Sequence, residues 1–268
     1  MKVAFQGEPG AYSEMATIQY FPNAEYVPMK SFQDVFDSVE SGKIDCAVVP
    51  IENSIEGSIN EAYDLLLQTS MVVSGEIYQR IRHCLIVNKN TNSISNVFSH
   101  PQALAQCRTY LQNRGLEPIA TYDTAGAVKM IKEKRIMDAA AIASRRAAEL
   151  YGMVILEEGI EDRKNNFTRF LVLSKLETKP TGHDGTSIIF SVPHAPGALF
   201  DVLEEFANRN INLTRIESRP TKETPWEYYF YVDFEGHLCD KIIEEALRSI
   251  KRKSAFIKIL GSFKRAEF

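Results

Sequence analysis

The sequence predicts an α/β protein built from two similar lobes, followed by a smaller domain with the element order βαββαβ. Three observations favour this fold class. Apolar runs typical of buried strands alternate with helical patterns through the first half, the elements of that half recur at one constant offset, and the last third has a different order of elements. A length of 268 residues also suits about two domains.

The first lobe is expected to begin with a short strand over Val3–Gln6 and a helix over 13–20. Ser31 is a good N-cap with Asp34 three residues later, and apolar residues follow at helical spacing, so a second helix is predicted there. The nearly all-apolar run over 44–50 is typical of a strand covered on both faces.

The second lobe repeats this order. A strand is predicted over 96–99, a helix from Pro101 at its favoured first position, a helix capped by Thr124, and a buried strand over 138–143. Both strands lie 93 residues after their counterparts, and Thr124 lies 93 residues after the cap Ser31, which indicates an internal duplication. Ligands of such sheets bind at the carboxyl ends of strands, so we expect a site in the cleft between the lobes.

The last third begins after a polar stretch, 176–185, whose Pro and Gly residues are typical of a linker. The order that follows is βαββαβ, a ferredoxin-like plan whose sheet leaves a face or edge for a partner copy. The predicted elements are a strand over 186–192, a helix over 197–208, strands over 211–218 and 226–234, a helix over 240–250 and a strand over 255–260.

Composition excludes several classes of protein. The chain has 44% hydrophobic and 25% charged residues, so it carries the apolar surface that a disordered chain lacks. A formal net charge of −4 argues against nucleic-acid binding. No apolar run approaches the roughly 20 residues of a membrane span, and no signal-peptide segment precedes the first strand, so no membrane association and a cytoplasmic location are expected.

The cysteines do not indicate a metal site or a disulfide framework. They form no CxxC and have no His at ligand spacing, so we expect four small buried hydrophobic residues: Cys46, Cys84, Cys107 and Cys239. The common signatures of nucleotide cofactors, zinc proteases and serine hydrolases do not occur either.

Polar segments at the predicted strand ends are the candidate site. Two glycines in the segment 7–13 let backbone N–H groups approach an anion at a helix N-terminus, with a tight turn as the alternative. The segment 50–58 gathers carboxylates, an amide and hydroxyls where the chain leaves the sheet, which favours a site there, with an ordinary loop as the alternative. At the matching end in the second lobe, 99–102 is followed by Gln106, although Ser99 or His100 serving only as a helix cap is the alternative.

A fourth segment, 165–170, precedes an apolar strand. An Arg and a Thr at the start of a buried strand are costly unless paired, and a guanidinium matches a carboxylate in bidentate fashion. A salt bridge from Arg169 to a nearby Glu is the alternative to ligand binding.

In this order, the motifs resemble those of the prephenate dehydratase family, and the C-terminal stretch resembles an ACT domain. The residues that carry the resemblance are GEPGAYSE at 7–14, PIENSIEGS at 50–58, SHPQAL at 99–104, NFTRF at 166–170, GALF at 197–200 and ESRP at 217–220. The resemblance implies a catalytic region over 1–176 of the type II periplasmic-binding-protein kind, with lobes of about 1–80 plus 160–176 and 81–159. It further implies a linker over 177–185 and an ACT regulatory domain over 186–264, and it matches the form that lacks a preceding chorismate mutase.

Family enzymes convert prephenate to phenylpyruvate, CO2 and water without a cofactor or a metal. Prephenate carries two carboxylates and a ring hydroxyl, whose departure needs a proton or hydrogen-bond donor. The resemblance assigns Thr168 to the leaving hydroxyl and Asn53, Ser99 and Gln106 to catalysis and positioning. It assigns substrate binding to Arg169 (as a carboxylate anchor or a brace), Ser54, Asp123, Thr124, Ala11, Tyr12 and Ser13.

The ACT resemblance implies allosteric regulation by L-phenylalanine and a homo-oligomer, either a dimer or a dimer of dimers (a homotetramer). The effector residues would be Gly197, Ala198, Leu199, Phe200, Glu217, Ser218, Arg219 and Pro220. Two alternatives remain open: an arogenate dehydratase, which has the same leaving group on a substrate with an amine, and a non-enzymatic amino-acid-binding sensor.

Overall fold

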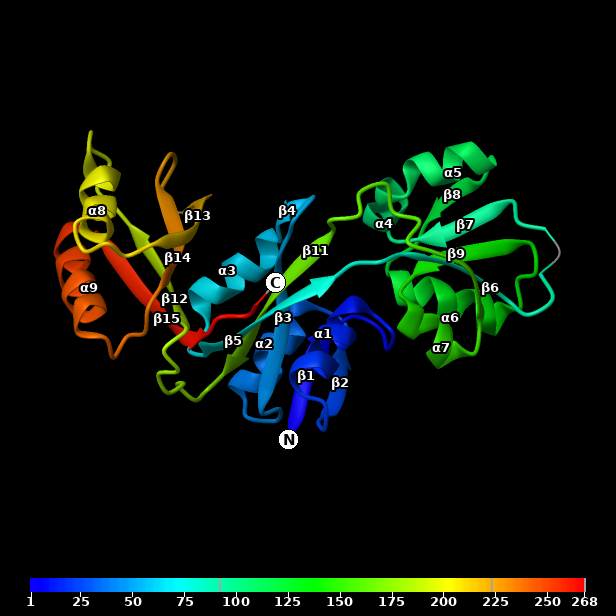
Figure 1. Cartoon of the computed structure of the whole chain (residues 1–268), viewed down its shortest axis with the longest axis horizontal. Coiled ribbons are helices and arrows are strands. Elements are labelled where there is room, and N and C mark those ends of the chain that lie inside the picture. The colour runs from blue at the N-terminus through cyan, green and yellow to red at the C-terminus, as the bar shows by residue number, and fades with distance from the viewer. Residues whose placement is uncertain (92, 223, 268) are drawn as a thin grey trace. The chain divides into compact units, whose positions relative to one another are not determined.

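The computed structural model describes residues 1–91, 93–222 and 224–267 (Figure 1). The chain divides into two compact units. The first comprises Met1–Ala62 and Ile77–Phe170, and the second comprises Tyr63–Glu76 together with the chain from Leu171 onwards. None of the helices in the described ranges is long and apolar enough to cross a membrane.

The first sheet has the strand order β2-β1-β3-β11-β5, with the short β4 paired to β3. Its strands are β1 (Lys2–Gln6), β2 (Glu25–Met29), β3 (Cys46–Asn53), β4 (Gly57–Ser58), β5 (Val72–Arg80) and β11 (Phe167–Ser174). The helices α1 (Tyr12–Tyr20), α2 (Phe32–Glu40) and α3 (Asn60–Gln68) belong to the same stretch of chain. The predicted capping box starts α2: Ser31 accepts from the Asp34 N–H, and the Asp34 carboxylate accepts from the Ser31 N–H.

The second sheet has the order β10-β6-β9-β7-β8. Its strands are β6 (Cys84–Val87), β7 (Asn96–Ser99), β8 (Glu117–Ala120), β9 (Ala139–Ala143) and β10 (Val154–Glu158), and its helices are α4 (Pro101–Gln106), α5 (Arg108–Arg114), α6 (Thr124–Lys134) and α7 (Arg145–Tyr151). The helix predicted from Pro101 is interrupted at Cys107, which separates α4 from α5.

The two sheets confirm the predicted pair of similar lobes. The order β2-β1-β3 in the first corresponds to β8-β7-β9 in the second, and both sets are parallel. The pairing register is also conserved between the lobes, because Val3 lies opposite Cys46 and Asn96 lies opposite Ala139. Both members of the second pair lie 93 residues after those of the first.

One predicted cap is wrong by one residue. Asp123, and not Thr124, is the N-cap of α6, and its carboxylate accepts the Gly126 N–H at 2.7 Å. Both side chains can cap a helix, but only the residue preceding the first helical turn has its oxygen in reach of these N–H groups. The cap in the second lobe therefore lies 92 residues after Ser31.

The expectation for the cysteines holds only in part. Cys84 and Cys107 are buried, but Cys46 is half-buried and Cys239 is exposed. The strand β9 is buried throughout because helices cover both of its faces: Ala139, Ala141 and Ala143 pack with α6 and α7, while Ala140 and Ile142 pack with α4 and α5.

The second unit contains the βαββαβ element order that the sequence predicts. Its antiparallel sheet has the order β13-β14-β12-β15. The elements are β12 (Asp184–Ser191), α8 (Ala198–Ala207), β13 (Leu213–Pro220), β14 (Tyr228–Glu235), α9 (Lys241–Lys253) and β15 (Phe256–Lys264). Figure 1 shows α8 and α9 side by side along one face of this sheet, where Val202, Phe206 and Ile250 are buried against Val232 and Phe234.

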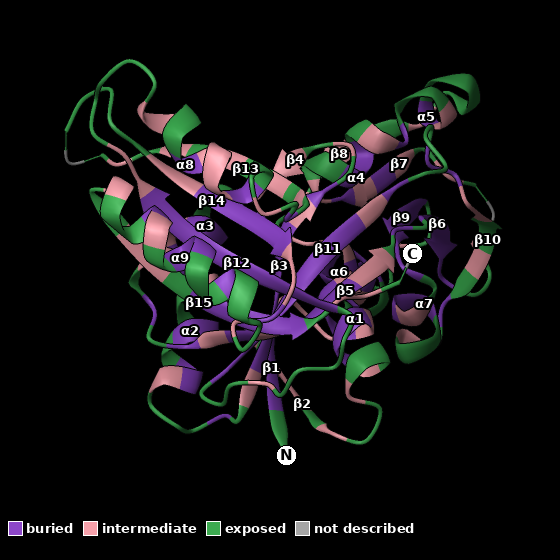
Figure 2. Ribbon diagram, turned by 60° about the vertical axis from the view of Figure 1, so that its left-hand side comes forward, coloured by how far each residue is buried: buried purple, intermediate pink, exposed green. Residues whose placement is uncertain are grey.

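The residues Tyr63–Glu76 cover the other face of the sheet. Because side chains alternate along a strand, Tyr231 points away from the face that carries Val232. Its hydroxyl donates to the Tyr63 carbonyl at 2.8 Å, and the two rings are 4.8 Å apart. Lys258 Nζ donates to the carbonyls of Leu66 and Leu67 and thus satisfies the C-terminal end of α3. In Figure 2 the strand β12 is accordingly buried along most of its length, and β14 is buried over Tyr231–Phe234.

Within the first unit, the loop after β1 packs tightly against the start of α7. Gly10 has φ +95°, and a Cβ added there would lie 2.8 Å from the Ala147 Cα. The Gly10 carbonyl accepts the Ser144 hydroxyl, which also caps α7. A residue with no side chain is therefore required both by the backbone angle and by the close approach of two chain segments.

We expect Gly10→Ala to lower the free energy of unfolding by roughly 2–5 kcal/mol, as the sum of the positive-φ and overpacking penalties. Gly115→Ala is the matched control, because Gly115 has φ +64° but nothing within 4 Å of an added Cβ. The free energy of unfolding of Gly115→Ala should fall only by the positive-φ penalty, roughly 1–2 kcal/mol. Urea unfolding of both variants measures the difference, and equal losses would contradict the close packing at Gly10.

Candidate active site

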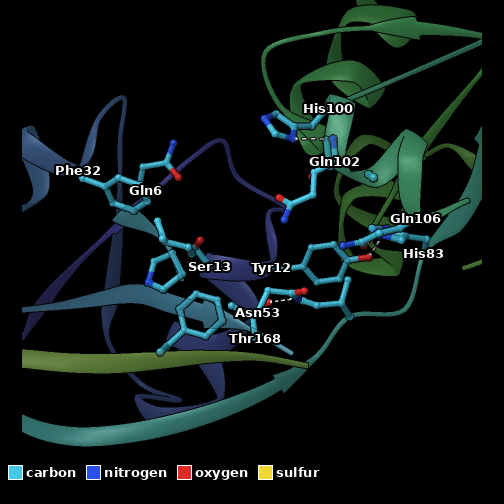
Figure 3. Close-up of a pocket in the computed structure, with 16 residues that line it drawn as sticks. Gln6, Tyr12, Ser13, Phe32, Asn53, His83, His100, Gln102, Gln106 and Thr168 are labelled. Carbon is cyan, nitrogen blue, oxygen red and sulfur yellow. Dashed lines mark hydrogen bonds between the residues drawn. The ribbon is translucent and has the colours of Figure 1, made fainter. Parts of the chain in front are cut away.

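A cavity of about 370 Å³ lies where the strand ends of the two lobes meet (Figure 3). Both lobes contribute to its wall, and polar side chains alternate with apolar ones around it. The lining residues are Gln6, Tyr12, Ser13, Phe32, Pro50, Asn53, Ile59, Ile81, His83, His100, Gln102, Ala103, Gln106, Thr124, Thr168 and Phe170.

Three helices begin at this cavity. Tyr12 and Ser13 are the first residues of α1, Gln102 lies in the first turn of α4, and Thr124 is the first residue of α6. The N-terminus of a helix carries a partial positive charge and N–H groups that point outward. The start of α1, which has no side-chain cap, therefore suits an anionic ligand, whereas α4 is capped by His100 and α6 by the Asp123 carboxylate.

The end of β3 and the start of β11 are joined by Ser54. Its hydroxyl donates to the Asn165 carbonyl at 3.1 Å and accepts the Phe167 N–H at 3.0 Å, while its own N–H donates to the Phe167 carbonyl. These bonds place Asn53 and Thr168, from strands far apart in the sequence, next to each other.

The Asn53 side chain is fixed by the backbone. Its Oδ1 accepts the N–H groups of Ile55 and Glu56, each at 3.0 Å, so its Nδ2 is the donor to the Thr168 Oγ1 at 3.0 Å. Because the threonine oxygen accepts in this contact, its own proton is not consumed and can be directed into the cavity.

A second set of hydrogen bonds continues from Asn53 into the other lobe. Asn53 Nδ2 donates to Asn166 Oδ1 at 2.8 Å, and Asn166 Nδ2 donates to Gln106 Oε1 at 2.8 Å. The same Gln106 oxygen is 3.0 Å from His83 Nε2, and His83 Nδ1 is 3.1 Å from the Tyr12 hydroxyl. Figure 3 shows the Tyr12 ring between Asn53 and His83, with its hydroxyl directed at the histidine.

Burial determines the protonation states of His83 and Tyr12. It lowers the pKa of His83 below its ordinary value of 6.5, against the opposing effects of the Gln106 hydrogen bond and the nearby Glu161. Burial also raises the pKa of Tyr12 well above its ordinary value. At neutral pH His83 is therefore a neutral imidazole and Tyr12 a neutral phenol.

Six of the predicted site residues line this cavity: Tyr12, Ser13, Asn53, Gln106, Thr124 and Thr168. Ser54 and Ala11 lie outside the wall, Ser54 as the strand connection described above and Ala11 as the N-cap of α1. Ser99 is fully buried, and its hydroxyl donates to the Ile142 carbonyl at 2.6 Å. Asp123 caps α6 and lines an adjacent cavity of about 660 Å³.

Arg169 lies between two cavity-lining residues of β11, Thr168 and Phe170. Alternation along the strand directs its side chain to the opposite face of the sheet. Of the two roles predicted for Arg169, this position favours the brace over the carboxylate anchor. For the helix α4, His100 takes the capping role, since its Nδ1 accepts the Gln102 N–H.

Several cavity and network residues were missed by sequence reasoning, above all His83 and Asn166. Asn166 belongs to the NFTRF motif but was given no role, and His83 stands alone before an apolar strand, where no spacing distinguishes it from a structural histidine. Within the described ranges, no group of three or more His, Cys, Asp and Glu side chains is arranged to hold a metal ion.

The residues predicted for the effector lie on α8 and β13 of the second unit. Gly197, with φ +83°, is the N-cap of α8, Ala198 and Leu199 begin the helix, and Phe200 is exposed. Leu199 lines a cavity of about 130 Å³ together with Val192, Pro193, His194, Ala195, Trp226, Glu227, Tyr228 and Phe230. Glu217, Ser218, Arg219 and Pro220 form the last half of β13.

Comparison with known families and structures agrees with this architecture. The prephenate dehydratase family model matches residues 3–178, and the ACT domain model matches residues 186–252. The chain belongs to the prephenate dehydratase family, and an ACT domain follows its catalytic region.

Individual relatives cover nearly the whole chain. The arogenate dehydratase/prephenate dehydratase 2 of Arabidopsis thaliana chloroplasts is 44% identical over 98% of this chain and 72% of its own length. The structure of prephenate dehydratase from Arthrobacter aurescens in complex with L-phenylalanine superposes with a TM-score of 0.91 and 30% identity, over 99% of this chain and 90% of that one. A structure described as GqqA, a novel type of quorum quenching acylase, also reaches 0.91, with 33% identity over 99% and 98% of the two chains.

The depressed pKa of His83 gives a stability prediction. Below about pH 6.5 the imidazole of the unfolded chain takes up a proton that the folded one resists, so the free energy of unfolding falls as the pH drops toward the folded-state pKa. Chemical denaturation of the wild type between about pH 7 and 5.5 should show a larger loss than His83→Gln. Replacement of the exposed His194 by Gln is the control, and a wild-type slope equal to that of His83→Gln would contradict the prediction.

Proposed function

We propose that this protein is a prephenate dehydratase that converts prephenate to phenylpyruvate, CO2 and water. The observation that carries the proposal is the Thr168 hydroxyl, which lines the cavity and accepts a hydrogen bond from Asn53 Nδ2. A hydroxyl that accepts a hydrogen bond is a better donor, because the bonds in such a chain polarise one another. Thr168 is thus suited to stabilise a departing oxygen.

The charge of the substrate supports the same assignment. Prephenate carries carboxylates, and the N-terminus of α1 lies at the cavity. The first turn of α1 has no side-chain cap at Ala11, so its backbone N–H groups are available to a carboxylate. Apolar residues, among them Phe32, Ile81 and Phe170, provide a surface for the ring.

The reaction needs one donor at the leaving oxygen and no covalent intermediate. The bond between the ring and its carboxylate breaks to release CO2, the electron pair enters the ring, and the bond to the ring hydroxyl breaks. The departing hydroxide takes up one proton and leaves as water, so the dianion and one proton give the phenylpyruvate anion, CO2 and water. A donor already oriented in a closed cavity stabilises the charge that develops on that oxygen.

This geometry does not favour an acyl-transfer role of the kind described for GqqA. A threonine nucleophile needs an adjacent base to remove its proton. The neighbour of Thr168 Oγ1 described above is the amide N–H of Asn53, which is a donor and cannot take that proton.

We expect Thr168→Ala to lower kcat by about 100- to 1000-fold with KM nearly unchanged, because the interaction is made chiefly in the transition state. Thr168→Ser keeps the hydroxyl and is the matched control, which should stay within about 10-fold of the wild type. Steady-state formation of phenylpyruvate measures both variants. Near-wild-type turnover by the alanine variant would remove Thr168 from the proposed role.

Arogenate dehydratase is the second candidate, since a relative at 44% identity is named for both activities. The two substrates share the leaving group and differ by an amine on the side chain. The ratio of kcat/KM for prephenate and arogenate on the purified protein decides between them. Release of CO2 from neither substrate would favour the non-enzymatic sensor.

We further propose that L-phenylalanine regulates this activity through the ACT domain, which pairs with a second copy to form a dimer or a dimer of dimers. Support comes from the helix α3, which starts two residues after the β3–β4 hairpin at Asn53. In the second unit, the α3 residue Asp64 forms ion pairs with Arg219 at 3.3 Å and Lys222 at 2.6 Å. Arg219 belongs to the predicted effector motif, so one helix connects that motif to the hairpin of the site.

We expect Asp64→Asn to keep basal turnover within about twofold while changing the response to L-phenylalanine by roughly 2- to 30-fold in the coupling constant. Glu61→Gln, which removes an exposed carboxylate from the first turn of the same helix, is the control and should respond as the wild type does. Titration of the steady-state rate with L-phenylalanine measures the coupling. An unchanged response in the Asp64 variant would exclude this ion pair from the connection.

A further inference from the structure

We propose that Asn166 and His83 are positioning residues that hold Gln106 as a hydrogen-bond donor toward the substrate, beside the Thr168 hydroxyl that Asn53 orients. The inference rests on the proposed function, because it names how the same cavity orients its donors. Neither residue needs to touch the reacting atoms. Both act through a chain of hydrogen bonds whose direction is set at one end by the backbone.

The donor-to-acceptor direction of these hydrogen bonds is set at Asn53. Two backbone N–H groups, from Ile55 and Glu56, donate to its Oδ1, and a backbone N–H can only donate. The Nδ2 group of Asn53 therefore faces Asn166, whose atom at 2.8 Å must be the acceptor Oδ1. This assignment leaves the Asn166 Nδ2 as the donor to Gln106, so the glutamine atom at 2.8 Å must be Oε1.

The same series of hydrogen bonds determines which ring nitrogen of His83 carries the proton. Gln106 Oε1 is an acceptor, so His83 Nε2, at 3.0 Å, has to carry a proton. In the neutral imidazole the other nitrogen, Nδ1, is then an acceptor, and it shares the single Tyr12 hydroxyl proton with the Arg82 carbonyl, which lies 2.9 Å from the same hydroxyl. Asn166 and His83 are both buried, at 0% and 2% exposure, so solvent cannot substitute for a missing partner in this chain.

These hydrogen bonds determine which atoms of Gln106 and Thr168 face the cavity. Gln106 Oε1 is occupied by two donors, so Gln106 directs only its Nε2 hydrogens outward, with Glu56 Oε1 at 3.4 Å on that side. The same chain makes Thr168 Oγ1 an acceptor toward Asn53 and frees its proton. Both residues are thus donors, which suits carboxylates and a departing hydroxide. An inverted Gln106 amide would direct an acceptor at an anion.

The first test uses the ligand-free wild type and needs no turnover. The ring nitrogens of His83, followed by 15N NMR at neutral pH, should show the tautomer that is protonated at Nε2. In Asn166→Asp the new carboxylate still accepts from Asn53 but cannot donate to Gln106. The glutamine amide should then invert, and His83 should shift toward the tautomer protonated at Nδ1. A wild-type histidine protonated at Nδ1 would overturn the proposal, even if the substrate were a different one.

The second test uses a matched pair of histidine variants. His83→Gln places an amide N–H near the position of Nε2, whereas His83→Asn places one near the position of Nδ1. We expect kcat to fall about 10- to 100-fold in His83→Asn and Asn166→Asp, as for a misplaced donor. We expect His83→Gln to recover most of that loss.

Equal activity of the two histidine variants, with both folded by circular dichroism, would show that the donor at Nε2 does not position Gln106. If the NMR result holds but the wild type turns over neither prephenate nor arogenate, the chain is real and the proposed function is wrong. The two failures are therefore distinguishable.

Discussion

Two backbone N–H groups, those of Ile55 and Glu56, determine the polarity of the whole site. They sit in the β3–β4 hairpin, where the chain turns back after Asn53, and both donate to the Asn53 oxygen. Every later assignment follows from this one, because each amide passes its orientation to the next partner. If any one of these side-chain amides were inverted, a donor would face a donor or an acceptor would face an acceptor. In a buried environment each such unmade hydrogen bond costs about 1–3 kcal/mol.

The two lobes bring this hairpin to its partners. The repeated register, Val3 opposite Cys46 and Asn96 opposite Ala139, directs the carboxyl ends of both sheets to one cavity. The lobes are not equivalent there, however. The first contributes Asn53 and Thr168, held together by Ser54, and the second contributes Gln106 on α4. The duplication accounts for the strand order that both lobes share. The polar side chains that differ between the lobes give the cavity its hydrogen-bonding groups.

Much of this frame was predictable from the sequence, and the exceptions have physical causes. Buried strands such as β3 and β9 appear as apolar runs because both faces are covered. Edge strands do not: β2 and β8 each contain a proline and have no buried residue, so neither an apolar run nor an apolar–polar alternation marks them. Six predicted site residues line the cavity because strand ends converge by topology. The roles of His83 and Asn166 depend on partners 23 and 60 residues away, which no local pattern encodes.

The helix α3 shows why the division into units matters for regulation. Its first residues follow the hairpin that orients Asn53, and from Tyr63 onward the chain belongs to the second unit. There it is held by Tyr231 and Lys258 on the face of the sheet opposite α8 and α9, and by the ion pairs of Asp64. A shift of β13 or β14 would act on α3 through these contacts. That helix begins at Asn60, shortly after the hairpin that contains the N–H groups of Ile55 and Glu56. In the proposed regulation an effector need not reach the cavity, because a displacement of the hairpin would change the orientation of Asn53, on which the direction of the Thr168 proton depends.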